Sequence, residues 1–227
     1  MSNELQALEN KVAALEERLG ILDDVHAIRR LQYAYGYFID KCMYNETVDL
    51  FADDGEVRFL GGRYKGKAGV RRLYVERFQK QFTGGKNGPV YGFLLDHPQI
   101  QDIIDVAPDR KSARCRARSM MQAGRHESAP GPKRAWWEGG TYENEYVREG
   151  GVWKIKVLNY NAQWRGNYER GWAHEPLEDP IYKQKDLYPS SPIGPDELIQ
   201  PPPVFWPYTE VVPFHYPHPV TGKPIKV

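Results

Sequence analysis

The order of the hydrophobic patterns along the chain constrains its fold more than any other feature. Apolar residues recur at helical spacing through much of residues 1–82, and a strand-like run interrupts them at residues 56–60. Alternating, strand-like runs follow at about residues 94–106, 111–122, 136–148 and 152–164. Helices that precede a series of consecutive strands are typical of an α+β domain, in which helices cover one face of an antiparallel sheet.

The first 22 residues carry a heptad pattern of their own. Apolar residues stand three and four positions apart: Leu5, Leu8, Val12, Leu15, Leu19 and Leu22. A helix this short needs tertiary or quaternary burial to persist in water. It either docks on its own domain or forms a coiled-coil contact between subunits, and the heptad spacing favours the coiled coil. We predict that residues 1–22 are a helical extension that helps to form a homo-oligomer, a dimer or a trimer.

The helical pattern restarts after Gly20, with Asp23 and Asp24 as the expected N-cap of a separate helix. One stripe of this helix is apolar and suits the core: Ile28, Leu31, Tyr35, Phe38 and Cys42. An adjacent stripe carries ionisable and phenolic groups: Tyr33, Tyr37, Asp40 and Tyr44. We expect this second stripe to face a pocket on the concave side of the sheet.

Alternation within the strand-like runs predicts which side chains face inward. In the run 111–122, one face carries Ala113, Cys115, Ala117 and Ser119, and the other carries Arg114, Arg116 and Arg118. The arginine face suits solvent or an interface better than an anion site. In the run 152–164, the same rule places Asn159 on the interior face with Trp153, Ile155 and Val157.

Length and charge exclude several classes of function. The 227 residues suit one domain with extensions, and a net charge of +1 argues against a nucleic-acid or anionic-membrane surface. No apolar run is long enough to span a bilayer, and the polar N-terminus lacks a secretion signal. Two cysteines, Cys42 and Cys115, fit a reduced, cytoplasmic setting. The 29 aromatic residues suit flat aromatic ligands or subunit contacts.

The C-terminal part has a different composition. From Pro176 onward it holds 13 of the 18 prolines together with several aromatic residues, which a disordered linker would lack. We predict three parts: the extension at 1–22, a catalytic domain at 23–172, and an extended arm at 173–227 that packs on a neighbouring subunit.

Several segments between residues 23 and 165 carry a family resemblance. They are Ala27-Ile-Arg-Arg-Leu, Tyr35, Ile39-Asp40, Leu50-Phe-Ala-Asp-Asp-Gly-Glu-Val, Tyr64-Lys-Gly, His97 with Ile100 and Ile104, Lys111-Ser-Ala-Arg-Cys-Arg-Ala, Gly140-Thr-Tyr-Glu-Asn-Glu-Tyr and Gly151-Val-Trp-Lys-Ile. Their order and spacing resemble the SnoaL-like branch of the nuclear transport factor 2-like superfamily. The resemblance implies a cone-shaped α+β fold, with helices packed on a strongly curved antiparallel sheet.

The resemblance also implies site residues. Scytalone dehydratase-like members of this branch place a helix aspartate and a strand histidine around the substrate, and Asp40 and His97 stand at the matching positions. The second strand histidine of those enzymes is not evident in residues 112–122. The N-terminal heptads and the aromatic, proline-rich tail resemble the layout of the sphingomonad diarylpropane and phenylcoumaran γ-formaldehyde lyases of lignin-dimer catabolism.

The candidate catalytic residues are Asp40, His97, Tyr37 and Lys41. A buried carboxyl group and an imidazole can exchange protons near neutral pH, a tyrosine can donate to a substrate oxygen, and a lysine can pair with a phenolate. The candidate substrate-binding residues are Tyr33, Tyr44, Phe59, Tyr142 and Asn159. We predict no metal site, because His215 and His218 lack a third ligand nearby in the sequence.

These observations lead to a functional hypothesis with two alternatives. The chain is expected to be a cofactor-independent lyase that converts a lignin-derived phenolic dimer into a stilbene and releases formaldehyde. One alternative is a dehydratase, cyclase or isomerase that uses the same Asp40 and His97 on another aromatic or polyketide substrate. The other is a non-catalytic subunit, similar to the small subunits of ring-hydroxylating dioxygenases.

Overall fold

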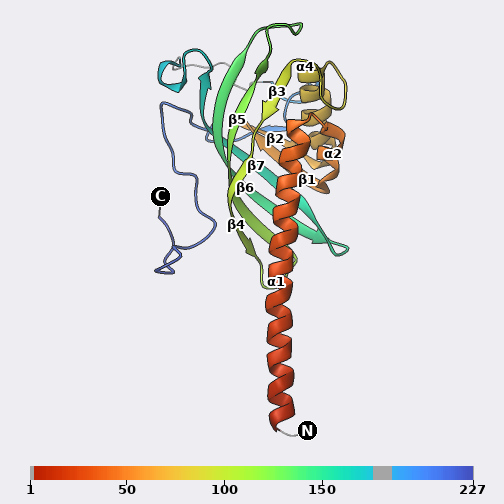
Figure 1. The fold of residues 1–227 in the computed structure, drawn as a ribbon, viewed down its shortest axis with the longest axis vertical. Coiled ribbons are helices and arrows are strands. Elements are labelled where there is room, and N and C mark those ends of the chain that lie inside the picture. Colours follow the sequence, from red (N-terminus) through yellow and green to blue (C-terminus); the bar gives the residue numbers. More distant parts are fainter. Residues whose placement is uncertain (1–2, 176–185, 227) are drawn as a thin grey trace.

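The computed structural model describes residues 3–175 and 186–226, so the part of the predicted arm at 176–185 lies outside the described residues. A single helix, α1 (Asn3–Asp40), runs along much of the length of the molecule and extends well beyond the body at its N-terminal end (Figure 1). The predicted break after Gly20 is wrong, since α1 continues through Asp23 and Asp24 without interruption. Residues 3–19 are all exposed, so this part of the helix does not dock on its own domain.

Asp24 does not cap a helix but fastens α1 to the sheet. Its side chain is buried, and Trp153 Nε1 donates to its Oδ1 over 2.9 Å. Arg110 Nε donates to the other oxygen over 2.5 Å, and an Arg110 guanidinium nitrogen also reaches the carbonyl of Gly20. These partners come from distant parts of the sequence, which explains why a local capping rule misassigned the residue.

Four short helical segments follow α1 before the main strands. They are α2 (Tyr44–Asp49), α3 (Gly66–Arg71), the π-helical segment η1 (Arg72–Gln79) and α4 (Lys80–Thr83). The last three form one continuous helical stretch, which agrees with the helical spacing that the sequence shows up to residue 82. Gly84 ends it with a left-handed backbone (φ 67°), which glycine adopts without steric cost. A 3-10 turn, η2 (Trp172–His174), lies near the end of the domain.

Among the residues that the structure describes, eight strands form one curved, open sheet. They are β1 (Phe51–Phe59), β2 (Gly62–Lys65), β3 (Phe93–Asp96), β4 (Gln99–Val106), β5 (Ser112–Arg125), β6 (Ala135–Glu149), β7 (Val152–Asn167) and β8 (Glu197–Leu198). The order is β3-β5-β6-β7-β1-β2-β8, and β4 also pairs with β5. All pairs are antiparallel except β1 with β7, so the sheet is mixed. The predicted α+β fold with helices on a curved sheet is confirmed.

The predicted strand run at residues 94–106 divides into two strands at His97 and Pro98. β3 pairs with residues 122–125 of β5, whereas β4 pairs with residues 113–119 of the same strand. His97 therefore lies in the break between β3 and β4, beside the C-terminal end of α1. Its backbone N–H bonds to the side chain of Asp40 over 3.0 Å instead of to a strand.

The predicted alternation of β5 is confirmed: Ala113, Cys115, Ala117 and Ser119 are buried, and Arg114 and Arg118 are exposed. The prediction for β7 is wrong beyond Ile155. Tyr146 pairs with Ile155 but Glu145 pairs with Val157, so Lys156 is an extra residue in β7. Such a bulge reverses the alternation, and Leu158, Tyr160 and Ala162 face inward in place of Asn159.

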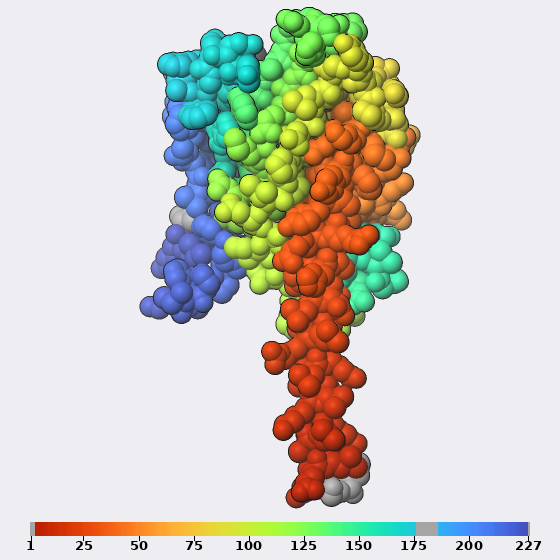
Figure 2. All heavy atoms as spheres, viewed as in Figure 1, coloured from red at the N-terminus to blue at the C-terminus, as the bar shows by residue number. Residues whose placement is uncertain are grey.

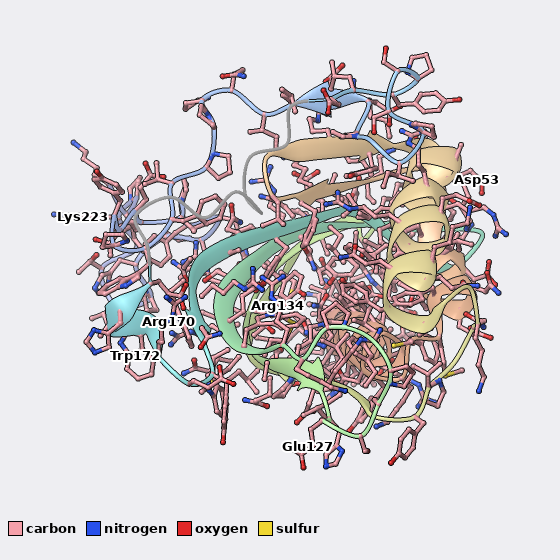
Figure 3. The ribbon with its side chains drawn as sticks, turned by 90° about the horizontal axis from the view of Figure 1, so that it is seen from above. Asp53, Glu127, Arg134, Arg170, Trp172 and Lys223 are labelled. Atoms are coloured by element: carbon pink, nitrogen blue, oxygen red, sulfur yellow. The ribbon has the colours of Figure 1, made fainter. Side chains whose placement is uncertain are left out.

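The described part of the arm, residues 186–226, packs on the outer face of the same chain's sheet. β8 pairs with β2, and the N–H of Trp206 donates to the carbonyl of Gln163 on β7 over 3.0 Å. His215 bonds through Nδ1 to Glu143 on β6. Figure 3 shows the end of the arm near Lys223 outside the curved sheet, away from the helices. A contact of the arm with a neighbouring subunit stays a prediction.

The described residues include no helix with the length and apolar character that a bilayer crossing requires.

Candidate active site

A cavity of about 160 Å³ lies between the helical layer and the inner face of β5, β6 and β7. Its walls are mostly aromatic and aliphatic: Tyr35, Ile39, Tyr44, Phe59, Leu73, Tyr74, Phe78, Phe82, Phe93, Tyr142, Leu158 and Tyr160. An engineered cavity of about 150 Å³ holds benzene, so this space accepts at least one aromatic ring. Figure 3 looks toward the cavity along the length of the molecule, with the sheet curving around one side and the helices closing the other.

His97 and Asp40 form a hydrogen-bonded pair at the cavity wall. His97 is 5% exposed and lines the cavity, and its Nδ1 bonds to Asp40 Oδ1. The same oxygen accepts the His97 backbone N–H, so both the ring and the backbone of His97 are fixed by one carboxylate. Because Nδ1 is occupied, Nε2 is the nitrogen that can act on a bound molecule. Within the described part of the chain, nothing is hydrogen-bonded to Nε2.

A buried amide holds the backbone of His97 from the other side. Gln99 Nε2 donates to the carbonyl of His97 over 2.9 Å, and Gln99 Oε1 accepts from Gln32 on α1 over 2.7 Å. Gly36 makes this approach possible, since a Cβ at that position would lie 2.8 Å from Cγ of Gln99. The glycine therefore lets the helix lie close to the strand that follows the histidine.

Three buried tyrosines place their hydroxyl groups together at the wall. Tyr35 and Tyr74 share a hydrogen bond of 3.0 Å, and the ring of Tyr142 lies edge-on to that of Tyr35. Burial raises the pKa of Tyr35 to about 12 and raises the pKa of Tyr74 and Tyr142 well above 10. All three therefore keep their protons at neutral pH, and they can donate to a substrate oxygen but cannot act as bases.

The opposite part of the cavity is lined by charged residues: Arg134 just before β6, Glu138 on β6 and Arg165 on β7. Trp136 has two guanidinium groups near its ring, that of Arg165 at 4.9 Å and that of Arg134 at 5.4 Å from the centroid. Glu138 is buried and accepts a hydrogen bond from Tyr160 over 3.0 Å. Arg134 lies on the concave side of the sheet in Figure 3. This end suits an oxygen-bearing or anionic part of a ligand.

One buried donor in this charged end has no partner. Nε1 of Trp136 is inaccessible to solvent and forms no hydrogen bond with any described residue. A buried unpaired N–H costs about 1–3 kcal/mol, and a ligand oxygen that accepts from it would recover that free energy. The orphaned donor is therefore an indication of ligand binding that is independent of the His97–Asp40 pair.

The structure brings together five of the nine candidate residues. His97, Tyr44, Phe59 and Tyr142 line the cavity, and Asp40 lies directly behind His97. The other four do not reach it. Tyr37 is 74% exposed, Lys41 is exposed, and Tyr33 donates to Asp102 over 2.9 Å. Asn159 lines a separate groove between β7 and the arm.

Tyr37 of α1 lies outside the cavity for a simple geometric reason. The row of α1 that lines the cavity is Tyr35 and Ile39, of which the sequence analysis placed Tyr35 in the core stripe, whereas Tyr37 is about 200° further round the helix from Tyr35. Sequence reasoning also missed Tyr74, Trp136, Glu138 and Arg165. The only available signal was the Trp136-Trp137-Glu138 run, since a tryptophan beside a carboxylate in a strand is unusual on a solvent face.

The family of SnoaL-like domains matches residues 20–159 of this chain. The comparison with curated proteins gives no match. Among solved structures, LinA is 19% identical with a TM-score of 0.54, over 72% of this chain and 99% of that chain. A related LinA is described as a hexachlorocyclohexane dehydrochlorinase.

Two further structures come from Novosphingobium aromaticivorans. A provisionally named scytalone dehydratase is 20% identical with a TM-score of 0.52, over 72% of this chain and 97% of that chain. A provisionally named aromatic ring hydroxylase is 18% identical with a TM-score of 0.51, over 64% of this chain and 94% of that chain. At these identities the likeness shows the fold.

Proposed function

Because this chain belongs to the family of SnoaL-like domains, we propose that it is a cofactor-independent lyase that acts on a phenolic diaryl compound. The substrate carries a benzylic hydroxyl group and, on the next carbon, a CH2OH group. The products are a stilbene, water and formaldehyde. The observation that carries the proposal is the His97–Asp40 pair, in which His97 is buried at the wall of a cavity lined by aromatic rings and Asp40 occupies its Nδ1, which leaves Nε2 for a bound molecule.

The first step removes the benzylic hydroxyl group. In its protonated form, stabilised by Asp40, His97 donates the proton on Nε2 to the hydroxyl oxygen, and the C–O bond breaks to release water. Glu138 takes the proton of the phenol, and the electron pair of that O–H bond moves through the ring to form a quinone methide. The hydroxyl groups of Tyr35, Tyr74 and Tyr142 supply hydrogen bonds to oxygen atoms of the bound diol.

The second step breaks a carbon–carbon bond. Neutral His97 now removes the proton from the CH2OH group, formaldehyde leaves, and the electrons of the broken C–C bond form the stilbene double bond. The ring becomes a phenolate again and recovers its proton from Glu138. His97 ends the cycle protonated, as it began, so the protons and electrons balance without a cofactor. Positioned acid–base groups contribute about 10²- to 10⁴-fold each.

The charged end of the cavity suits the phenol end of the substrate. Arg134 and Arg165 supply positive charge beside Glu138, and Nε1 of Trp136 is a donor that none of the described residues accepts from. A phenol or phenolate oxygen there would satisfy the tryptophan and lie near the base. The aromatic rings of Phe59, Tyr142 and Tyr160 supply surfaces against which the aryl groups can stack.

Product analysis tests this proposal. Purified protein is incubated with a diarylpropane diol that carries a para-hydroxyl group, and formaldehyde and near-ultraviolet absorbance are measured. We expect formaldehyde and the stilbene, measured by its near-ultraviolet absorbance, to form in equal molar amounts. We expect His97→Gln to abolish both products and the exposed His174→Gln to leave them unchanged. Absence of formaldehyde from the wild-type reaction would rule out the lyase.

The same pair supports a second candidate, a dehydratase that stops after the first step. Loss of water uses the acid at His97 Nε2 and the base at Glu138, as in the first step, but it needs no removal of the CH2OH proton; the proton then returns from Glu138 to His97 through solvent. A product that keeps all its carbon atoms, with one water lost and no formaldehyde, would identify this activity.

A further inference from the structure

The N-terminal half of α1 displays an apolar seam that is exposed to solvent. Its six members, Leu5, Leu8, Val12, Leu15, Leu19 and Leu22, are each between 44% and 61% exposed. Residues 3–19 project about 25 Å along the helix axis, and Figure 2 shows them clear of the body. A helix of this length has little stability without packing, so the seam requires an occupant.

The seam faces away from the chain's own domain. The row of α1 that packs on the body near the junction is Gly20, Asp24 and Ile28. Leu22 is two residues from Asp24 and Leu15 is nine, which places both about 180–200° round the helix from that row. Another molecule can therefore reach the whole seam, including its last member beside the body.

Over the two complete heptads, acidic residues lie along one edge of the seam and basic residues along the other. With Leu5, Val12 and Leu19 as a positions and Leu8, Leu15 and Leu22 as d positions, the e positions are acidic: Glu9, Glu16 and Asp23. The g positions of the two complete heptads are basic: Lys11 and Arg18. All five side chains are exposed. Acidic e and basic g positions on one helix form a complementary pair of edges.

We propose that this seam binds the same helix of a second copy in a parallel coiled coil. In a parallel pair each g residue meets the e residue of the next heptad across the interface, so Lys11 meets the partner's Glu16 and Arg18 meets the partner's Asp23. In an antiparallel pair, g meets g and e meets e, which would bring like charges together. Leucine at every d position with Val12 at a suits a two-stranded arrangement. The inference is independent of the catalytic proposal.

A pair of matched variants tests the seam in the full chain. Leu8→Glu with Leu15→Glu places two charges at d positions, and Ala7→Glu with Ala14→Glu places the same charges, seven residues apart, on the outside. We expect the first to weaken association by about 100-fold or more and the second to leave it unchanged, by light scattering against the chain mass of 26.2 kDa. Equal masses for the two variants would show that the seam does not hold the two copies together and would overturn the proposal.

A charge exchange tests the orientation. Lys11→Glu with Arg18→Glu should weaken association about tenfold or more, and adding Glu16→Lys and Asp23→Lys to the same chain should restore it. Restoration is specific to a parallel pair, because an antiparallel pair would keep like charges opposite each other in the exchanged chain.

Disulfide formation gives a second readout of orientation that does not depend on affinity. In a parallel pair, Leu5→Cys should cross-link to its own copy under mild oxidation, whereas Ala7→Cys should not; the native Cys42 and Cys115 are buried. A link that forms only when Leu5→Cys chains are mixed with Leu22→Cys chains would show an antiparallel pair and overturn the proposal.

Discussion

Asp40 makes two contacts with His97, and both go to the same carboxylate oxygen. One fixes the backbone at the break between β3 and β4, and the other fixes the ring. The structural and the chemical parts of this interaction can be separated, because an amide keeps an acceptor oxygen but loses the charge that stabilises a protonated imidazole.

Asp40→Asn should therefore reduce kcat by about 10²- to 10⁴-fold with a small change in melting temperature. Asp49→Asn makes the same chemical change at an exposed position of α2 and should have no effect on either quantity. Steady-state kinetics and thermal unfolding of both variants check the prediction. Full turnover by Asp40→Asn would remove His97 and Asp40 from the mechanism.

Trp136 allows a prediction in which stability and activity move differently. Trp136→Phe keeps an aromatic ring between Arg134 and Arg165 but removes the unpaired Nε1 donor. The free protein should lose little or no stability, since no hydrogen bond is broken, whereas kcat/KM should fall about 2- to 10-fold through the lost bond to substrate.

Trp137→Phe is the matched control for Trp136→Phe. Trp137 stacks on Tyr168 and does not line the cavity, so its replacement should leave kcat/KM unchanged. Equal kinetic effects of the two substitutions would show that the Nε1 donor of Trp136 has no part in substrate binding.

At the scale of elements, the attachment of α1 to the sheet depends on Asp24. Burial opposes ionisation of this carboxyl group, but hydrogen bonds from Arg110 and Trp153 and the charge of Arg148 outweigh burial and hold its pKa below the usual value. The unfolded chain therefore binds a proton at Asp24 at a higher pH than the folded chain does. The stabilisation is fully present above about pH 4 and is lost as the pH falls through the lower folded pKa.

Asp24→Asn should lower the free energy of unfolding at pH 7 by about 1–3 kcal/mol. The difference from the wild type should shrink as the pH is lowered below about 4, because the wild-type carboxyl group then becomes neutral as well. Urea unfolding at several pH values measures both effects. Glu127→Gln, at an exposed position between β5 and β6, should show neither. A difference that stays constant down to low pH would contradict the assigned role of the charge.

At the scale of the whole molecule, the sheet is covered on both faces, by helices on the inner face and by the arm on the outer face. Arg116 is the main contact between β5 and the end of the arm. Its guanidinium donates to the carbonyls of Val212 and Pro213 over 2.8 and 2.7 Å, and it lies 4.0 Å from the ring centroid of Phe214. It also pairs with Glu143 on β6.

Arg116→Ala should release the end of the arm while the cavity on the other face stays intact. Limited proteolysis should then cut faster within residues 210–226, and mass spectrometry of the fragments would locate the cuts. Arg114→Ala, an exposed neighbour on the same face, should leave the rate unchanged. Equal protection in the wild type and Arg116→Ala would show that the arm is held elsewhere.

Local patterns in the sequence were sufficient for the helices, for most strands and for the inner face of β5, since each depends on the spacing of neighbouring residues. The family resemblance pointed to Asp40 and His97, which the structure joins by hydrogen bonds, and their catalytic role stays a prediction. Local patterns failed for Tyr37, Asn159 and Asp24, and each failure concerns a contact with a distant segment. Asp24 is 129 residues from Trp153 in the sequence, and Asn159 was displaced by a bulge whose register depends on β6.

The sequence by itself therefore determined the succession of elements and the heptad seam, because hydrophobic periodicity and charge order are properties of the chain alone. The tertiary structure decided which of two adjacent stripes of α1 faces the cavity, and that Tyr35, Trp136 and Glu138 complete its walls. The physical reason is that a helix exposes every one of its stripes until a sheet packs against one of them. The contacts that select the stripe come from strands more than fifty residues away.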